Sequence, residues 1–219
     1  MCCGWYVYFS PQTPFLNCQL AQEISTLTRY TTAILHHGQV CFSTERIIVH
    51  KAIADPFTTH LATAFSNIPS AGHAVHKQSA DHAIELLREA QEKGAKILAG
   101  GIEYLSETSL KPTLITGVTK DMRIADEETF GPSAALYVAK DDDDAVRLAN
   151  DTVYGLNAAV HSRSWEHAYE VGKQLEFGQV HINNVTCTDS RKFFLSCYTS
   201  LAVASVMASV WAVFVDGFG

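Results

Sequence analysis

The chain has 219 residues, 47% of them hydrophobic, and a formal net charge of −7 at pH 7 from 23 acidic and 16 basic residues. This length suits one substantial hydrophobic core, and the acidic balance disfavours nucleic acid or anionic lipid as a partner. The six cysteines form no C-x-x-C pair and the first 15 residues contain no lysine or arginine, so we expect thiols in a reducing compartment, no signal peptide and a cytoplasmic location.

Helices and strands are predicted to alternate along most of the chain. Helices are identified by apolar residues at intervals of three and four, and strands by short β-branched or apolar runs. In chain order, the sequence predicts a helix over residues 19–37 that ends at Gly38, a strand over 46–50, a helix over 55–68, a helix capped by Ser79 that ends at Gly94, a strand over 96–99, a strand over 134–139, a helix over 141–150, a strand over 158–161, a helix capped by Ser164 and a strand over 179–183. This alternation predicts an α/β fold with a twisted, mainly parallel sheet flanked by helices.

Two groups of polar residues are candidates for metal sites and are interpreted otherwise. The four aspartates at residues 141–144 begin a predicted helix, where negative charge stabilises the helix dipole, so we interpret them as a solvated helix start. The pairs His36-His37 and His73-x-x-His76 have no acid or cysteine at ligand spacing beside them. We therefore expect no metal site and no Cys-His hydrolase.

The C-terminal end departs from this pattern. Residues 193–215 carry no charge and follow Arg191 and Lys192. Their length and hydropathy predict a transmembrane helix, and small residues spaced four apart in it suit helix packing in a membrane.

Several blocks of sequence, taken together and in order, resemble the aldehyde dehydrogenase family. The blocks are H-G-Q-V-C at residues 37–41 with Arg46 five residues later, K-P-T at 111–113, E-E-T-F-G-P at 127–132, A-N-D-T-V-Y-G-L at 149–156 and G-Q-V-H-I-N at 178–183. The first resembles the family's nucleophile motif, and the resemblance covers about residues 19–186. It implies that the predicted α/β fold is the catalytic domain of the aldehyde dehydrogenase architecture.

The resemblance also implies a mechanism and its residues. Cys41 is the implied nucleophile: its thiolate attacks an aldehyde to give a thiohemiacetal, which passes hydride to NAD or NADP and leaves a thioester for water to hydrolyse. Glu128 is implied to bind the nicotinamide-ribose hydroxyls, and Phe130 to support the nicotinamide ring. Asn183 is implied to be structural and to hold the active-site loops. Residues 44–46 are similar to the branch that oxidises aromatic aldehydes such as salicylaldehyde and vanillin.

Both ends of the chain depart from the family pattern. Residues 1–18 do not contain the family's E-L-G-G-K type block with its general-base glutamate, and there is no room for a dinucleotide-binding domain before Cys41. We therefore expect a catalytic domain at residues 19–186 without its cofactor-binding half, an atypical segment at 1–18 and an atypical apolar tail at 187–219. Either an error in the gene model or a truncated relative with a membrane anchor at 193–215 explains these ends.

The predicted function is oxidation of a small-molecule aldehyde to a carboxylic acid with NAD or NADP, impaired by truncation. One alternative is a catalytically inactive fragment that acts as an interaction module, and another is a weak, cofactor-independent cysteine esterase. The expected protein partners are a second copy of the chain or a full-length relative. No nucleic acid is expected to bind, and a membrane is expected only through the apolar tail.

Overall fold

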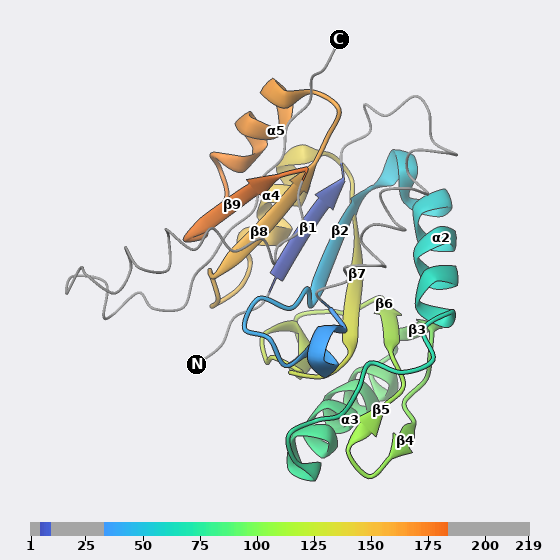
Figure 1. Cartoon of the computed structure of the whole chain (residues 1–219). Helices are drawn as coiled ribbons and strands as arrows, with labels where there is room; N and C mark the ends of the chain where they lie inside the picture. Colours follow the sequence, from blue (N-terminus) through green and yellow to red (C-terminus); the bar gives the residue numbers. More distant parts are fainter. Residues whose placement is uncertain (1–4, 10–32, 184–219) are drawn as a thin grey trace, which may run out of the picture.

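The structure, a computed structural model, describes residues 5–9 and 33–183 and is built around one seven-stranded sheet (Figure 1). The strand order is β3-β6-β7-β2-β1-β8-β9. Neighbouring strands are parallel except β3, which runs antiparallel to β6. The strands are β1 (Trp5–Phe9), β2 (Arg46–His50), β3 (Lys96–Ala99), β6 (Thr113–Thr116), β7 (Ser133–Ala139), β8 (Asn157–His161) and β9 (Gln179–Ile182), with a separate hairpin of β4 (Tyr104–Ser106) and β5 (Ser109–Leu110). The predicted α/β class with a mainly parallel sheet is confirmed.

Helices cover both faces of the sheet because the central strands are apolar on both sides. Ile47 and Val49 of β2 pack in the core cluster that contains α2, whereas Ile48 between them packs with α4 and α5. The helices are α2 (Ala54–Ser66), α3 (Lys77–Glu92), α4 (Asp142–Asn150) and α5 (Trp165–Gly172), and the short 3-10 helices are η1 (Leu35–Gly38), η2 (Lys51–Ile53) and η3 (Arg123–Ala125). Figure 1 shows α2 on one flank of the sheet and α4 on the other.

Most of the predicted elements that fall on described residues are confirmed. Helix α2 buries Phe57, Leu61 and Phe65, as its spacing predicts. The predicted cap of α5 is also present, since the Ser164 side chain accepts a hydrogen bond from the amide of His167. The predicted Ser79 cap is wrong, because α3 begins at Lys77 and its N-cap residue is His76. Residues 10–32, and with them most of the predicted helix at 19–37, lie outside the described part of the chain. The prediction is wrong for residues 33–37, which form a turn and the start of η1, because His36 and His37 have left-handed backbone conformations that end any α-helix before Gly38.

Strand β1 lies in the middle of the sheet, between β2 and β8, although the sequence pattern does not predict it. Its sequence W-Y-V-Y-F is rich in aromatic residues that favour strands, but it belongs to the segment at residues 1–18 that the family resemblance leaves out. The sheet therefore includes part of the segment that was expected to lie outside the catalytic domain.

The predicted transmembrane helix at residues 193–215 lies outside the described residues. Among the residues that the structure does describe, no helix is both long and apolar enough to cross a membrane.

Candidate active site

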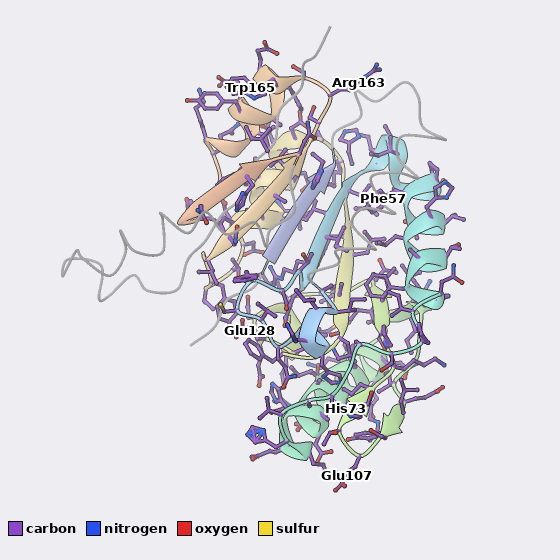
Figure 2. All side chains as sticks on the ribbon, in the orientation of Figure 1. Phe57, His73, Glu107, Glu128, Arg163 and Trp165 are labelled. Carbon is purple, nitrogen blue, oxygen red and sulfur yellow. The ribbon has the colours of Figure 1, made fainter. Side chains whose placement is uncertain are left out.

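The sequence blocks that suggest a function converge at one edge of the sheet. Cys41 precedes β2, Glu128 and Phe130 precede β7, residues 149–156 lead into β8 and Gly178 precedes β9. Because β7, β2, β1, β8 and β9 are parallel neighbours, the segments before them meet at the amino ends of the strands. Figure 2 shows Glu128 beside the η1 segment at this edge. The structure thus brings together residues that are far apart in the sequence.

Cys41 lies in a tight turn that presents its thiol outward. The amide of Ser43 donates a hydrogen bond of 2.7 Å to the carbonyl of Val40, so Cys41 and Phe42 are the two central residues of the turn. The side chain of Cys41 is exposed. This segment therefore offers a thiol to solvent, as a nucleophile requires.

The backbone before Cys41 is left-handed over three consecutive residues. His36, His37 and Gly38 have φ values of +51°, +66° and +73°. The ring of His37 is buried, and its Nε2 accepts a hydrogen bond of 2.9 Å from the amide of Leu110. Burial is the main cause, and the nearby His73 the second, of a pKa of His37 that is lowered from 6.5 to about 4. A neutral imidazole can accept this bond. His37 therefore connects residues 36–46, called the nucleophile segment after the predicted role of Cys41, to the β4–β5 hairpin.

Gln39 connects the same segment to the loop that contains His73 and Val75. Its side-chain nitrogen donates to the carbonyls of His36 and His73, and its oxygen accepts a 2.8 Å hydrogen bond from the amide of Val75. The amide side chain thus uses both its donor and its acceptor groups to hold the turn.

Gly38 lies against the loop that contains Glu128 and Phe130. A Cβ atom at Gly38 would overlap the carbonyl group of Gly131, with the carbonyl carbon only 2.5 Å away. The two glycines come from different sequence blocks, H-G-Q-V-C and E-E-T-F-G-P. This close backbone approach places the nucleophile segment beside the loop of Glu128 and Phe130, which we call the second loop.

The Glu128–Phe130 loop is held by Glu45, a residue that the sequence does not single out as a site residue. Its carboxylate accepts hydrogen bonds from the amides of Thr129 (3.1 Å) and Phe130 (3.0 Å) and from the Thr129 hydroxyl (3.0 Å). Burial raises the pKa of Glu45, and the hydrogen bonds from Thr129 and Phe130 act in the opposite direction. In the sequence, this role of Glu45 is indicated only by the position of an acidic residue directly before a predicted buried strand.

Arg46 connects the nucleophile segment to the A-N-D-T-V-Y-G-L block. The guanidinium group is buried, donates a 3.4 Å hydrogen bond to the carbonyl of Asp151 and lies 3.8 Å from the Asp126 carboxylate. It also lies 5.6 Å from the centre of the Tyr137 ring. A planar cation can make all three contacts at once, which accounts for an arginine at this position.

Glu128 and Phe130 are partly buried in the second loop. The carbonyl of Glu128 accepts a 3.0 Å hydrogen bond from the ring of His82 on α3. The pKa of Tyr154 is raised first by burial and then by the negative charge of Glu128, so these two side chains are electrostatic neighbours. Asn183 does not lie at this edge: it directly follows β9, at the carboxyl ends of the strands, where its side chain donates to the carbonyl of Ser162 directly after β8. That contact is consistent with a structural role.

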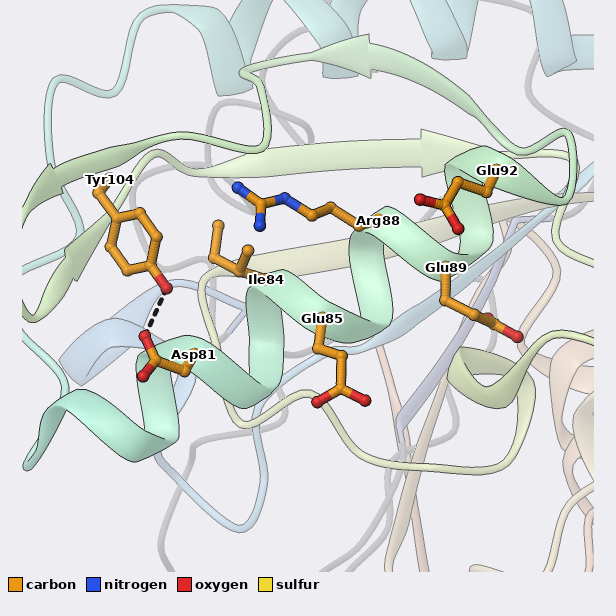
Figure 3. A pocket seen from close by; sticks show the side chains of 7 residues that line it. All are labelled: Asp81, Ile84, Glu85, Arg88, Glu89, Glu92 and Tyr104. Atoms are coloured by element: carbon orange, nitrogen blue, oxygen red, sulfur yellow. Dashed lines mark hydrogen bonds between the residues drawn. The ribbon is translucent and has the colours of Figure 1, made fainter.

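A hollow of about 400 Å³ on the surface of α3 is a different feature from this site. Figure 3 shows acidic side chains and Arg88 along one helix face, with Tyr104 hydrogen-bonded to Asp81. Three of the acids form ion pairs: Asp81 with Lys77, Glu85 with Arg123 and Glu89 with Lys93. We interpret the hollow as a solvated helix face. Within the described residues, no group of His, Cys, Asp and Glu side chains is arranged to hold a metal ion.

Comparison with known proteins gives one consistent result. Residues 18–195 match the model of the aldehyde dehydrogenase family. A salicylaldehyde dehydrogenase from Pseudomonas sp. (strain C18) is 39% identical over 165 residues, which are 70% of this chain and 34% of that protein. The chain therefore spans about a third of the length of this curated relative.

Solved structures agree. A salicylaldehyde dehydrogenase from Pseudomonas putida G7, complexed with salicylaldehyde, is 30% identical with a TM-score of 0.74, over 86% of this chain and 39% of that one. An NADP-dependent glyceraldehyde-3-phosphate dehydrogenase from Bacillus halodurans C-125, complexed with NADP, is 27% identical with a TM-score of 0.75, over 84% of this chain and 39% of that one.

Proposed function

Because the chain belongs to the aldehyde dehydrogenase family, we propose that its described residues supply the nucleophile half of a site that oxidises an aldehyde to a carboxylic acid with NAD or NADP. The observation that carries the proposal is the convergence of an exposed thiol, Cys41, with the loop of Glu128 and Phe130. A lone cysteine would not support it. A cysteine on a loop whose backbone closely approaches the loop of an acid and an aromatic residue does.

Cys41 is the proposed nucleophile. Its thiolate sulfur bonds to the aldehyde carbon while the carbonyl π electrons move to the oxygen, which gives a thiohemiacetal on the protein. The backbone amide of Cys41 is the proposed donor to that oxygen. The chemistry that NAD(P) supplies when bound is acceptance of a hydride. Water then releases the carboxylic acid from the Cys41 thioester.

The described residues fit one end of such a cofactor. The carboxylate of Glu128 accepts hydrogen bonds and suits ribose hydroxyls, while the ring of Phe130 offers an apolar surface, and both side chains are partly exposed. The described residues contain no G-x-G-x-x-G turn after a strand to hold a pyrophosphate. The fit is therefore to the nicotinamide and its ribose, and the remainder of a cofactor site would come from outside these residues.

An aromatic aldehyde is the proposed substrate class. Support comes from residues 44–46, which are similar to the branch that oxidises aromatic aldehydes, and from the salicylaldehyde dehydrogenase relative. A panel of aromatic and aliphatic aldehydes tests this point. Preference for an aliphatic aldehyde would contradict the substrate class while leaving the proposed reaction intact.

Formation of NAD(P)H from aldehyde by the purified chain tests the proposal, with Cys41→Ala as the comparison. We expect aldehyde-dependent reduction that Cys41→Ala abolishes. Equal rates in both proteins would overturn the role of Cys41. Hydrolysis of an activated ester by the wild type but not by Cys41→Ala, without NAD(P)H formation, would favour the cofactor-independent esterase, which the exposure of Cys41 allows. Neither activity in a folded sample would favour the inactive interaction module.

A further inference from the structure

Glu45 stands out because its contacts join two parts of the candidate site. It lies four residues after Cys41 and directly before β2. Its backbone carbonyl accepts a 2.8 Å hydrogen bond from the amide of Ala135, so its main chain is fixed to the start of β7. From this anchored position the carboxylate reaches the amides of Thr129 and Phe130. One residue therefore connects the nucleophile segment, the sheet and the second loop.

The loop that Glu45 holds has a backbone that needs support. Phe130 has φ +45°, in the left-handed region that residues other than glycine rarely adopt. Such a conformation persists only where the surroundings hold it. The amides of Thr129 and Phe130 point into the protein and both donate to Glu45 Oε1, within 3.0 to 3.1 Å. Three donors, the two amides and the Thr129 hydroxyl, face the carboxyl group of Glu45, and such donors favour its ionised form over its protonated form. Hydrogen bonds to an ionised acceptor are about twice as strong as those between neutral groups.

The contact extends beyond two amides. The hydroxyl of Thr129 donates to Glu45 and accepts hydrogen bonds from the Ser133 hydroxyl (3.0 Å) and the Gly131 amide (3.4 Å). Thr129 is buried, with 2% of its surface exposed. Every backbone amide from Thr129 to Gly131 therefore donates to Glu45 or to the hydroxyl bonded to it. Loss of the carboxylate would release the whole turn.

We propose that Glu45 is a positioning residue that holds the Glu128–Phe130 loop in register with Cys41. It does not contact the reacting atoms in this proposal. It fixes the turn that carries Glu128 and Phe130 to the same short segment that carries the thiol, so the two halves of the site cannot shift independently. This inference rests on the proposed roles of Cys41, Glu128 and Phe130.

Hydrogen exchange of the Thr129 and Phe130 amides, measured by mass spectrometry, tests the contact directly. Removal of two charge-assisted hydrogen bonds in Glu45→Ala should raise exchange of these amides by about tenfold or more. Glu45→Gln keeps an acceptor oxygen but loses the charge, so a rise of about threefold is expected. Glu107→Ala is the matched control, because Glu107 is an exposed acid in the turn between β4 and β5, which Figure 2 shows at the lower end of the molecule, below Glu128.

The second readout is the rate at which iodoacetamide alkylates Cys41, resolved from the other cysteines by peptide mapping over a range of pH. A positioning role predicts that the pH dependence of the Cys41 alkylation rate is shifted in Glu45→Ala. In Glu45→Gln this pH dependence should lie closer to that of the wild type, and in Glu107→Ala it should be unchanged. If Glu45→Ala does not fold, Glu45→Gln decides. Exchange at the wild-type rate in a folded variant, or faster loop exchange with an unaltered Cys41 profile, would overturn the inference.

These readouts are independent of NAD(P)H formation. An aldehyde assay that fails while loop exchange and Cys41 alkylation respond to Glu45 would count against the proposed function and leave the positioning contact supported. The reverse pattern, with turnover present and Glu45→Ala without effect on the loop, would count against Glu45 alone.

Discussion

Replacement of Gly38 by alanine is the sharpest test of how the two loops of the site are held together. Gly38 has φ +73°, where a side chain costs about 1–2 kcal/mol. The added Cβ would also meet the carbonyl group of Gly131, with its carbon 2.5 Å away, and the Ala33 oxygen at 3.1 Å. Both neighbours are backbone atoms that cannot rotate away, so the loops must separate, at a further cost of about 1–3 kcal/mol. The expected total is about 2–5 kcal/mol.

Gly117→Ala is the matched control, because Gly117 has φ +76° but its nearest neighbouring atom for a Cβ is 4.0 Å away. It should show the conformational cost alone, about 1–2 kcal/mol. Thermal unfolding followed by circular dichroism measures both, since 1 kcal/mol lowers the midpoint of a chain of this size by about 2–4 °C. Equal losses in the two variants would refute the claim that the close approach of Gly38 and Gly131 organises the site.

Three further changes test other contacts. Ser164→Ala removes the side-chain acceptor for the His167 amide at the start of α5 and should lower the free energy of unfolding by about 1 kcal/mol, measured by urea denaturation. Burial lowers the pKa of His161 from 6.5 to about 4, so between these pH values the unfolded chain binds more protons than the folded chain. The free energy of unfolding, measured by urea denaturation, should therefore fall as the pH drops from 6.5 towards 4. Its dependence on pH should be weaker in His161→Gln. Arg46→Lys cannot keep the bond to the Asp151 carbonyl together with the other contacts of the guanidinium group, and should lower the urea midpoint by the equivalent of about 1–2 kcal/mol. A midpoint equal to wild type for Arg46→Lys would show that the buried guanidinium does not hold the two blocks together.

The regular elements were predictable because each depends on local sequence. The spacing of Phe57, Leu61 and Phe65 predicts α2, and Ser164 predicts the start of α5. The predicted Ser79 cap fails because α3 begins two residues earlier, at Lys77. Strand β1 was missed because its place in the sheet depends on pairing with β2 and β8, which are distant in the sequence. Local pattern does not report such pairing.

The site residues also divide into those that local sequence identifies and those that depend on distant contacts. Motifs identify Cys41, Glu128 and Phe130, and the structure places their loops together. Glu45 was missed as a site residue because its importance lies in donors 84 and 85 residues away along the chain. A buried acceptor is recognisable only once its donors are placed. The contacts that organise this site are therefore less visible in the sequence than the groups they position.

Reactivity of the thiol and binding of the cofactor should be separable in this chain. The turn of Cys41 is held by contacts inside the described residues, through Gln39, Glu45 and Gly38, whereas the fit to NAD(P) is limited to Glu128 and Phe130. A dissociation constant of about 1 mM corresponds to a binding free energy of only about −4 kcal/mol. We take this as the strongest binding of NAD(P) that contacts to Glu128 and Phe130 alone can give. Cys41 should thus be alkylated at a rate that NAD below about 0.1 mM does not change. Protection of Cys41 at micromolar NAD would mean that the chain binds the whole cofactor, and the limited fit inferred for Glu128 and Phe130 would be wrong.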